Sequence, residues 1–159
     1  MGPYRIAFVS LGCAKNLVNT EQMMALCRQA GHTITGDPEG ADVAVLNTCG
    51  FIESAKSEAI EQILELARLK DQGKLGRLLV AGCLSQRYPD DIRAELPEVD
   101  GLLGTGSYTD VVTAVEELMA VQTFYCSNQF FLYISLYIII CLFNLQPVFS
   151  LPKQLSINF

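Results

Sequence analysis

Residues 5–16, "RIAFVSLGCAKN", place a short apolar run, a glycine and a cysteine in direct succession. The run over residues 5–11 is bounded by a proline and a glycine and is rich in strand formers, so it predicts a buried strand. A helix is expected next, with Asn19 as its N-cap and Gly31 as the left-handed residue that ends it. The stretch therefore predicts a strand–loop–helix unit whose loop carries Cys13.

The same order of elements recurs along the first 120 residues. Further strands are expected at residues 32–35, 41–47, 77–82 and 99–104. Helices are expected over about 54–72, after Cys83 with an interruption near Pro89, and after Ser107. This alternation predicts an α/β fold, an open, mostly parallel sheet with helices on both faces, joined by right-handed crossovers.

Three cysteines follow three of these strands, and each of them has a glycine as a neighbour in the sequence. Because the carboxyl ends of parallel strands share one edge of a sheet, and ligands of open α/β sheets bind there, we expect these thiols to converge. The neighbouring glycines allow the backbone and a bulky ligand to come close. The candidate ligand residues are Cys13, Cys49 and Cys83.

Two polar residues beside the first of these thiols face the same edge. Lys15 and Asn16 are candidates for a hydrogen bond to sulfide or to substrate, and the alternative for Asn16 is that it only makes the turn. His32 follows the expected helix end at the opposite edge, so it is expected to be a solvated residue and not a ligand.

The other cysteines are expected to have no part in the site. Cys27 lies on the apolar stripe of the first helix and is expected in the core, and no role is assigned to Cys126 or Cys141. Structural zinc prefers four ligands with closely spaced cysteine pairs, which this sequence lacks, whereas iron–sulfur clusters are bound by thiolates. Three thiolates on a four-iron cluster leave one iron open. A buried structural role for these thiols, or a disulfide between two of them, is the alternative.

Charge and composition narrow the class of protein. The net charge of −6 does not favour non-specific electrostatic binding to nucleic acid. No secretory signal is recognised at the N-terminus, and six cysteines then favour reduced thiols in a cytoplasmic compartment.

The composition changes sharply after residue 120. Residues 121–159 contain no glycine, alanine or acidic residue and one charged residue, Lys153, so the chain is divided into a domain at 1–120 and an apolar tail at 121–159. The apolar run over 130–143 is shorter than the ~20 residues of a membrane span, which makes a membrane anchor the less favoured interpretation. The hypothesis for the tail is a retained intron or a frameshift, with a tendency to aggregate.

Three motifs give the domain a family resemblance. They are "SLGCAKNLVNTE" at 10–21, "NTCGFIESAKSEAIE" at 47–61 and "AGCLSQRY" at 81–88. Over about residues 4–120 the chain resembles the N-terminal domain of radical-SAM methylthiotransferases. The first motif most resembles the RimO type, which methylthiolates an aspartate of a small-subunit ribosomal protein. The alternative is the MiaB type, which acts on adenosine in tRNA.

The resemblance implies that Cys13, Cys49 and Cys83 bind an auxiliary [4Fe–4S] cluster whose open iron carries the sulfur to be transferred. It also implies a sulfur donor, an electron donor, and a second [4Fe–4S] cluster that cleaves S-adenosylmethionine. That second cluster needs a Cys-x3-Cys-x2-Cys motif, which this chain lacks, so no catalytic residue is expected here and the truncated chain is expected to be inactive alone. Two other hypotheses are a non-catalytic iron–sulfur module that serves a partner, and a membrane-tethered α/β domain with structural thiols.

Overall fold

The computed structural model describes residues 3–50 and 52–120. In chain order the elements are β1 (Arg5–Ser10), α1 (Ala14–Gln29), β2 (Thr33–Thr35), β3 (Ala41–Thr48), α2 (Glu53–Asp71), β4 (Leu75–Gly82), α3 (Cys83–Arg87), α4 (Pro89–Glu95), β5 (Gly101–Gly104), the 3₁₀ turn η1 (Tyr108–Asp110) and α5 (Val111–Ala120). The predicted alternation of strands and helices is confirmed, including the helix break before Pro89.

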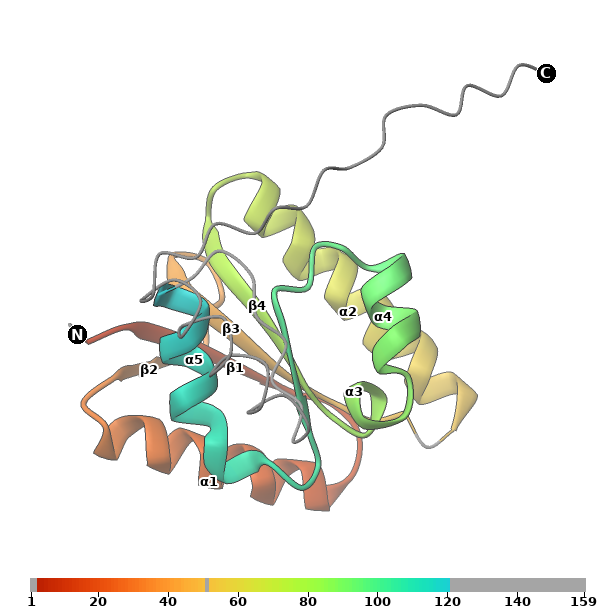
Figure 1. Cartoon of the computed structure of the whole chain (residues 1–159), viewed down its shortest axis with the longest axis horizontal. Helices are drawn as coiled ribbons and strands as arrows, with labels where there is room; N and C mark the ends of the chain where they lie inside the picture. The colour runs from red at the N-terminus through yellow and green to blue at the C-terminus, as the bar shows by residue number, and fades with distance from the viewer. Residues whose placement is uncertain (1–2, 51, 121–159) are drawn as a thin grey trace, which may run out of the picture. The chain divides into compact units, whose positions relative to one another are not determined.

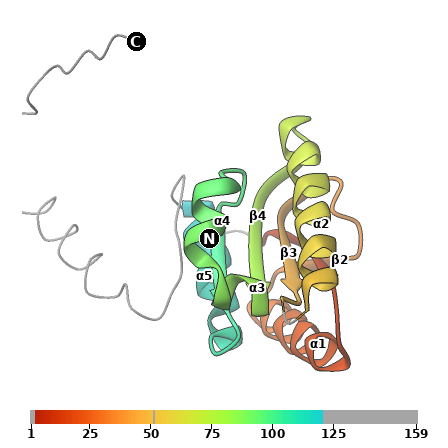
Figure 2. The same ribbon diagram turned by 90° about the vertical axis from the view of Figure 1, so that its right-hand side faces the viewer.

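The strands form one parallel sheet in the order β2-β1-β3-β4-β5. The predicted open parallel sheet with helices on both faces is therefore confirmed. In Figure 1, α1 and α5 lie together at the lower left, and α2, α3 and α4 lie at the right. Figure 2 shows β3 and β4 standing between helices on either side. The strand order reverses between β1 and β3, the position at which open α/β sheets commonly bind their ligands.

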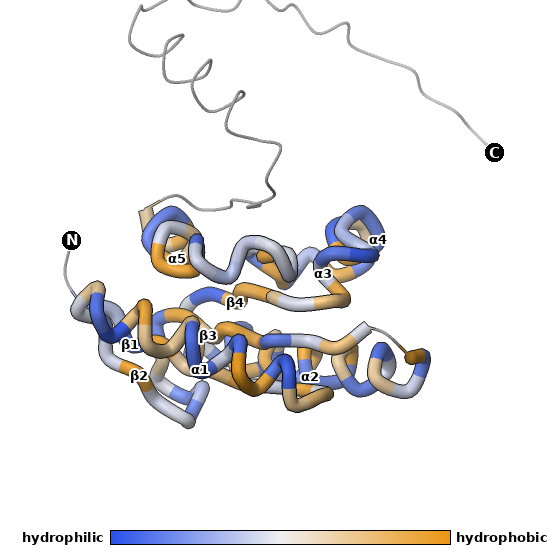
Figure 3. The backbone as a smooth tube through the Cα atoms, turned by 90° about the horizontal axis from the view of Figure 1, so that it is seen from below, coloured by the Kyte–Doolittle hydropathy of each residue, from blue (hydrophilic) through white to orange (hydrophobic). Residues whose placement is uncertain are grey.

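Alternate residues of the central strands face two separate cores. On one face Ala44, Leu46 and Val80 pack against α2, α3 and α4, and on the other Val43, Val45 and Leu79 pack against α1 and α5. Both faces of these strands are covered, which is why they are continuous apolar runs. Figure 3 shows this difference in hydropathy between strands and helices. Strands β3 and β4 are largely hydrophobic, whereas the helices also carry hydrophilic residues.

The start of the first helix differs from the prediction. Asn19 is not the N-cap; α1 begins at Ala14, and Cys13 takes the N-cap position with extended φ and ψ of −86° and 167°. The helix starts earlier because Gly12 turns the chain at once, with a φ of +90°. The predicted end is confirmed, since Gly31 has a φ of +92° and its N–H donates to the carbonyl of Arg28 at 3.0 Å.

The expectation of a solvated His32 is wrong. The residue is buried, its ring stacks on Tyr4 with 5.4 Å between ring centroids, and its Nδ1 accepts the Tyr4 backbone N–H at 3.2 Å. The reason is the pairing of β2 with β1, which brings the chain after α1 back against the residue that precedes β1. His32 does lie at the amino-terminal edge, away from the three cysteines.

The predictions about Cys126, Cys141 and the tail at 121–159 fall outside the described residues. The division of the chain after residue 120 likewise stays a prediction. Within residues 3–50 and 52–120, no helix is long and apolar enough to cross a membrane.

Candidate functional site

The three candidate thiols lie at the carboxyl ends of adjacent strands. Cys13 precedes α1 in the loop after β1, Cys49 directly follows β3, and Cys83 is the first residue of α3 after β4. Because β1, β3 and β4 are neighbours in the sheet, the three thiols share one edge, as the sequence predicts. Cys13 is exposed, Cys49 and Cys83 are half-buried, and all three are free of disulfides.

Close backbone contacts hold the three loops against one another. A Cβ atom placed on Gly12 would collide with Cβ of Cys49, so the loop of Cys13 touches the loop of Cys49 directly. A Cβ atom on Gly50 would lie 3.0 Å from Cα of Leu84, the residue after Cys83. Glycine is therefore required at position 12, and a side chain at position 50 would crowd the backbone of Leu84.

A buried polar network fixes the loop of Cys13 to the end of β3. Asn47 Nδ2 donates to the carbonyl oxygen of Asn16 at 2.9 Å and to Thr20 Oγ1 at 3.0 Å. Asn16 Nδ2 donates in turn to the carbonyl oxygen of Leu11 at 2.9 Å, and the Leu11 N–H donates to the Asn47 carbonyl oxygen at 2.9 Å. The network joins the segment around Cys13 to the residue two positions before Cys49.

The chain that leads into the third loop passes close beside Asn47 at Gly82. This residue has a φ of +102°, and a Cβ atom placed on it would lie 2.6 Å from Asn47 Oδ1 and 2.9 Å from the Thr48 N. Asn47 thus lies beside the chain that leads into all three cysteines. The sequence analysis did not identify Asn47 or Thr20 as part of the site. A usable signal was present, because Asn47 is a polar residue in an otherwise apolar strand and Thr20 is a polar residue on the buried face of a helix.

Cys13 is the thiol whose ionisation the fold favours most clearly. The backbone N–H groups of Asn16 and Lys15 at the open start of α1 lower the pKa of Cys13, and the Lys15 ammonium adds to the effect. These N–H groups approach the sulfur without completing a cap hydrogen bond. The Asn16 amide itself is buried and bonded to Leu11, so its side chain makes the turn, the second of the two predicted roles.

Tyr108 also faces this edge. Burial raises the pKa of the Tyr108 phenol, and the negative charges of Cys83 and Cys13 raise it further, against an opposing effect of the Asn19 side chain. Asn19 is the partner of the buried Tyr108 hydroxyl in this interaction, although the geometry falls short of a full hydrogen bond. No pattern in the sequence singles out this residue, since a tyrosine before a helix is ordinary.

The chemistry of the donor set bears on the kind of group that the three thiols could hold. Within the described part of the chain, no three cysteine, histidine or acidic side chains lie close enough to hold one ion. A four-iron cluster is a larger body that is ligated by thiolates around it, and the glycines leave room beside the sulfurs. The donor set, three free thiols with backbone N–H groups at one of them, fits such a cluster.

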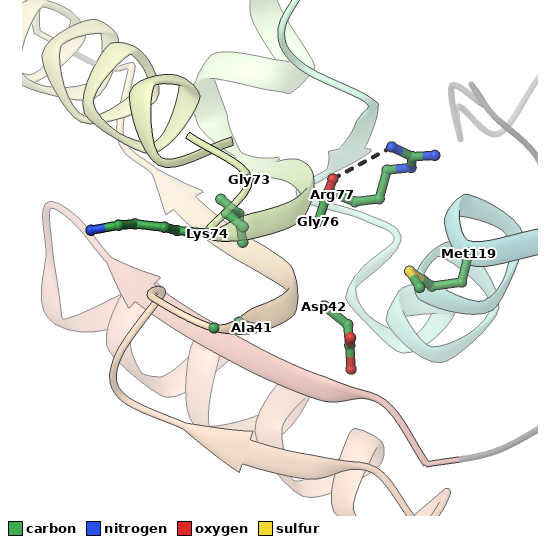
Figure 4. A pocket seen from close by; sticks show the side chains of 9 residues that line it. Ala41, Asp42, Gly73, Lys74, Gly76, Arg77 and Met119 are labelled. Carbon is green, nitrogen blue, oxygen red and sulfur yellow. Dashed lines mark hydrogen bonds between the residues drawn. The ribbon is translucent and has the colours of Figure 1, made fainter. Parts of the chain in front are cut away.

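A cavity of about 420 Å³ lies elsewhere, at the amino-terminal ends of β3 and β4. Its lining includes Asp42, Lys74, Arg77 and Met119, as Figure 4 shows. Strand direction separates this cavity from the thiols, because the cysteines follow the carboxyl ends of the same strands. It is therefore not part of the thiol site.

Comparison with known proteins gives the domain its relatives. A family model described as "Uncharacterized protein family UPF0004" matches residues 5–104. The chain is 48% identical over 118 residues to the ribosomal protein uS12 methylthiotransferase RimO of Clostridioides difficile, covering 74% of this chain and 27% of that protein. Proteins of the same name from Pelotomaculum thermopropionicum and Caldicellulosiruptor saccharolyticus are 50% and 53% identical over 115 and 114 residues, each covering 72% of this chain and 26% of the relative.

The chain thus spans about a quarter of the length of these relatives. The match covers β1 to β5, and so it includes every strand of the sheet and all three cysteine loops. The chain belongs to the UPF0004 family, and its domain is similar to the N-terminal domain of methylthiotransferases of the RimO type.

Proposed function

We propose that this chain is the auxiliary iron–sulfur domain of a ribosomal-protein methylthiotransferase, with Cys13, Cys49 and Cys83 as the ligands of a [4Fe–4S] cluster. The observation that carries the proposal is the placement of three free thiols on adjacent parallel strands, with their loops in direct contact. Such a cluster, held by three thiolates, supplies an iron with an open position where a sulfur for transfer can bind.

The chain's own residues prepare this site in three ways. The open start of α1 directs N–H groups at Cys13 and so stabilises its thiolate. The Asn47 network fixes the loop of Cys13 relative to β3 before any ligand binds. Cys13 is exposed while Cys49 and Cys83 are half-buried, so access from solvent is on the Cys13 side.

The proposed substrate is the aspartate of a small-subunit ribosomal protein. The similar proteins are named as methylthiotransferases of ribosomal protein uS12, which supports this choice over adenosine in tRNA. A sulfur donor, an electron donor, S-adenosylmethionine and a second [4Fe–4S] cluster complete the proposed reaction, in the cytoplasm. The sequence holds no Cys-x3-Cys-x2-Cys motif, so we expect no turnover from this chain alone.

Anaerobic reconstitution with iron and sulfide tests the proposal. The chain is prepared with Cys126→Ser and Cys141→Ser, so that thiols outside the site bind no iron, and iron, sulfide and visible absorption are measured. We expect one four-iron cluster per chain, which is lost in a Cys13→Ala, Cys49→Ala or Cys83→Ala variant. Cys27→Ala is the matched control. Cys27 is buried in the core that α1 and α5 cover, so its replacement should not affect cluster content. Equal iron uptake by the Cys49→Ala variant and its parent would refute the ligand assignment.

A further inference from the structure

A long side chain joins the loop of Cys49 to the helix that begins with Cys83. Arg87, the last residue of α3, donates from Nη1 to the carbonyl oxygen of Gly50 at 3.4 Å. Gly50 directly follows Cys49, and a Cβ atom placed on it would lie 3.0 Å from Leu84 Cα. The loop of Cys49 is therefore held against α3 twice, by a close backbone contact and by a side-chain hydrogen bond.

Helix geometry also places Arg87 beside Cys83. The two residues are the first and the last of α3, four positions apart, so they lie on the same face of the helix, one turn from each other. The helix itself contacts β3 and β4, at the ends of these strands in Figure 1. The side chain of Arg87 thus spans from the helix of Cys83 to the residue after Cys49.

An arginine suits this position because it combines several donors with a permanent charge. Its guanidinium presents five N–H groups in a planar fork and stays protonated in proteins. The hydrogen bonds of Asn47 join the loop of Cys13 to β3, whereas the bond of Arg87 joins the loop of Cys49 to α3. An iron–sulfur cluster held by three thiolates becomes more negative on reduction, so a cation beside it favours the reduced form.

We propose that Arg87 is a positioning residue of the thiol site, whose guanidinium holds the loop of Cys49 against α3 and places a fixed positive charge beside the bound cluster. This inference rests on the proposed function, because the spacing of Cys49 and Cys83 is argued there to serve one shared cluster. Arg87 is not a ligand and transfers neither a proton nor an electron. Loss of its hydrogen bond should weaken retention of the cluster, and loss of its charge should lower the reduction potential.

The test compares Arg87→Met, Arg87→Lys and Arg77→Met in the full chain with Cys126→Ser and Cys141→Ser, reconstituted anaerobically with iron and sulfide. Arg77 is the matched control. Its Nη1 also donates to a glycine carbonyl at 3.4 Å, that of Gly76, but near the amino-terminal end of β4. Three quantities are measured: the reduction potential of the bound cluster, the rate at which a chelator removes its iron, and the urea midpoint of the protein without cluster.

We expect Arg87→Met to shift the one-electron equilibrium about threefold towards the oxidised cluster, which lowers the potential by ~30 mV, and to release iron about tenfold faster. Arg87→Lys keeps the charge without the fork, so it should retain the wild-type potential and release iron at an intermediate rate. Arg77→Met should change neither quantity. Without cluster, Arg87→Met should unfold near the wild-type urea midpoint, because the Arg87 side chain is exposed.

The results that would overturn the inference are distinguishable from failure of the proposed function. With cluster bound, a wild-type potential and a wild-type release rate in Arg87→Met would overturn this inference alone. Equal changes in Arg77→Met would do the same, and so would loss of folding of Arg87→Met without cluster, which would assign Arg87 a structural role. If Arg87→Met folds but binds no cluster, Arg87→Lys carries the test, and iron release from it at the wild-type rate would overturn the inference. A wild-type chain that binds no cluster would overturn the proposed function, and this inference with it.

Discussion

At the scale of single residues, two cysteines of the same helix, Cys13 and Cys27, differ in the ionisation of their thiols. Burial raises the pKa of Cys27 to about 12, whereas the N–H groups at the start of α1 lower the pKa of Cys13. The two thiols belong to the same helix, one at its N-cap and one on its buried face. The difference between them follows from their surroundings, since both are unmodified thiols.

We expect alkylation to separate these two thiols in the protein without cluster. At pH 8, iodoacetamide should modify Cys13 several-fold faster than a free cysteine peptide and should leave Cys27 unmodified, as peptide mass spectrometry will show. Lys15→Gln should slow the reaction at Cys13, because the ammonium helps to stabilise the thiolate. Lys74→Gln, at the other edge of the sheet, is the control and should have no effect. Modification of Cys27 at the same rate as Cys13 would contradict this account.

The raised pKa of Cys27 also predicts a dependence of stability on pH. The unfolded thiol ionises near its ordinary value of 9.0, while the folded one stays neutral up to about 12. The folded state therefore holds the proton more tightly, and the contribution to the free energy of unfolding should fall as pH rises from 9 towards 12. Denaturant unfolding at pH 8 and pH 10.5 checks this. Cys27→Ala should show a smaller loss than the wild type over the same interval.

At the residue scale, Asn47 should matter for stability as well as for the site. Asn47→Ala removes two buried side-chain hydrogen bonds, to the Asn16 carbonyl and to Thr20 Oγ1, and should cost about 2 kcal/mol in the free energy of unfolding. A double-mutant cycle with Thr20→Val measures the interaction energy between the side chains of Asn47 and Thr20. Additive effects of the two substitutions would show that these side chains do not interact. Iron uptake by Asn47→Ala should fall because the loop of Cys13 is no longer fixed.

At the scale of elements, the passage from β4 into α3 is the most constrained. Gly82 has a φ of +102° and lies against the backbone carbonyl of Thr48, so Gly82→Ala combines backbone strain with a collision. We expect a loss of about 2 kcal/mol or more, with loss of cluster binding. Gly73→Ala is the matched control, since Gly73 has a φ of +70° with no atom within 4 Å of a Cβ placed there, and should cost about 1 kcal/mol. Equal losses, measured by urea unfolding, would contradict the close packing.

The strands and their order along the chain were predictable because apolar runs and glycine stops are local signals. The start of α1 was not, because Asn19 is a residue type that strongly favours the N-cap, while Cys13 is a weak cap that the turn at Gly12 imposes. The burial of His32 depends on Tyr4, a contact that only the pairing of β1 with β2 creates. The shared edge of the three cysteines followed from parallel strands alone, but Asn47 and Tyr108 depend on contacts between distant segments.

At the scale of the whole molecule, the described sheet and both of its cores lie within the first 120 residues. The buried residues of the two clusters, as far as the chain is described, run from Ile6 to Leu118. We therefore expect a chain cut after Ala120 to unfold in one cooperative transition, by circular dichroism and by fluorescence alike. The full chain is the control for solubility and should aggregate more readily. Non-coincident transitions in the shortened chain would contradict this expectation.

The strand order has a consequence for the sequence of events in assembly. Cys13, Cys49 and Cys83 are 36 and 34 residues apart along the chain, and only the register of β1, β3 and β4 brings them together. In the unfolded chain, gathering them would require closing two long loops, each at an entropic cost. Iron should thus enter after the central strands have paired. The bound cluster would cross-link the ends of the three strands and so stabilise the folded sheet. Loss of the metal and unfolding of the sheet would then be thermodynamically linked.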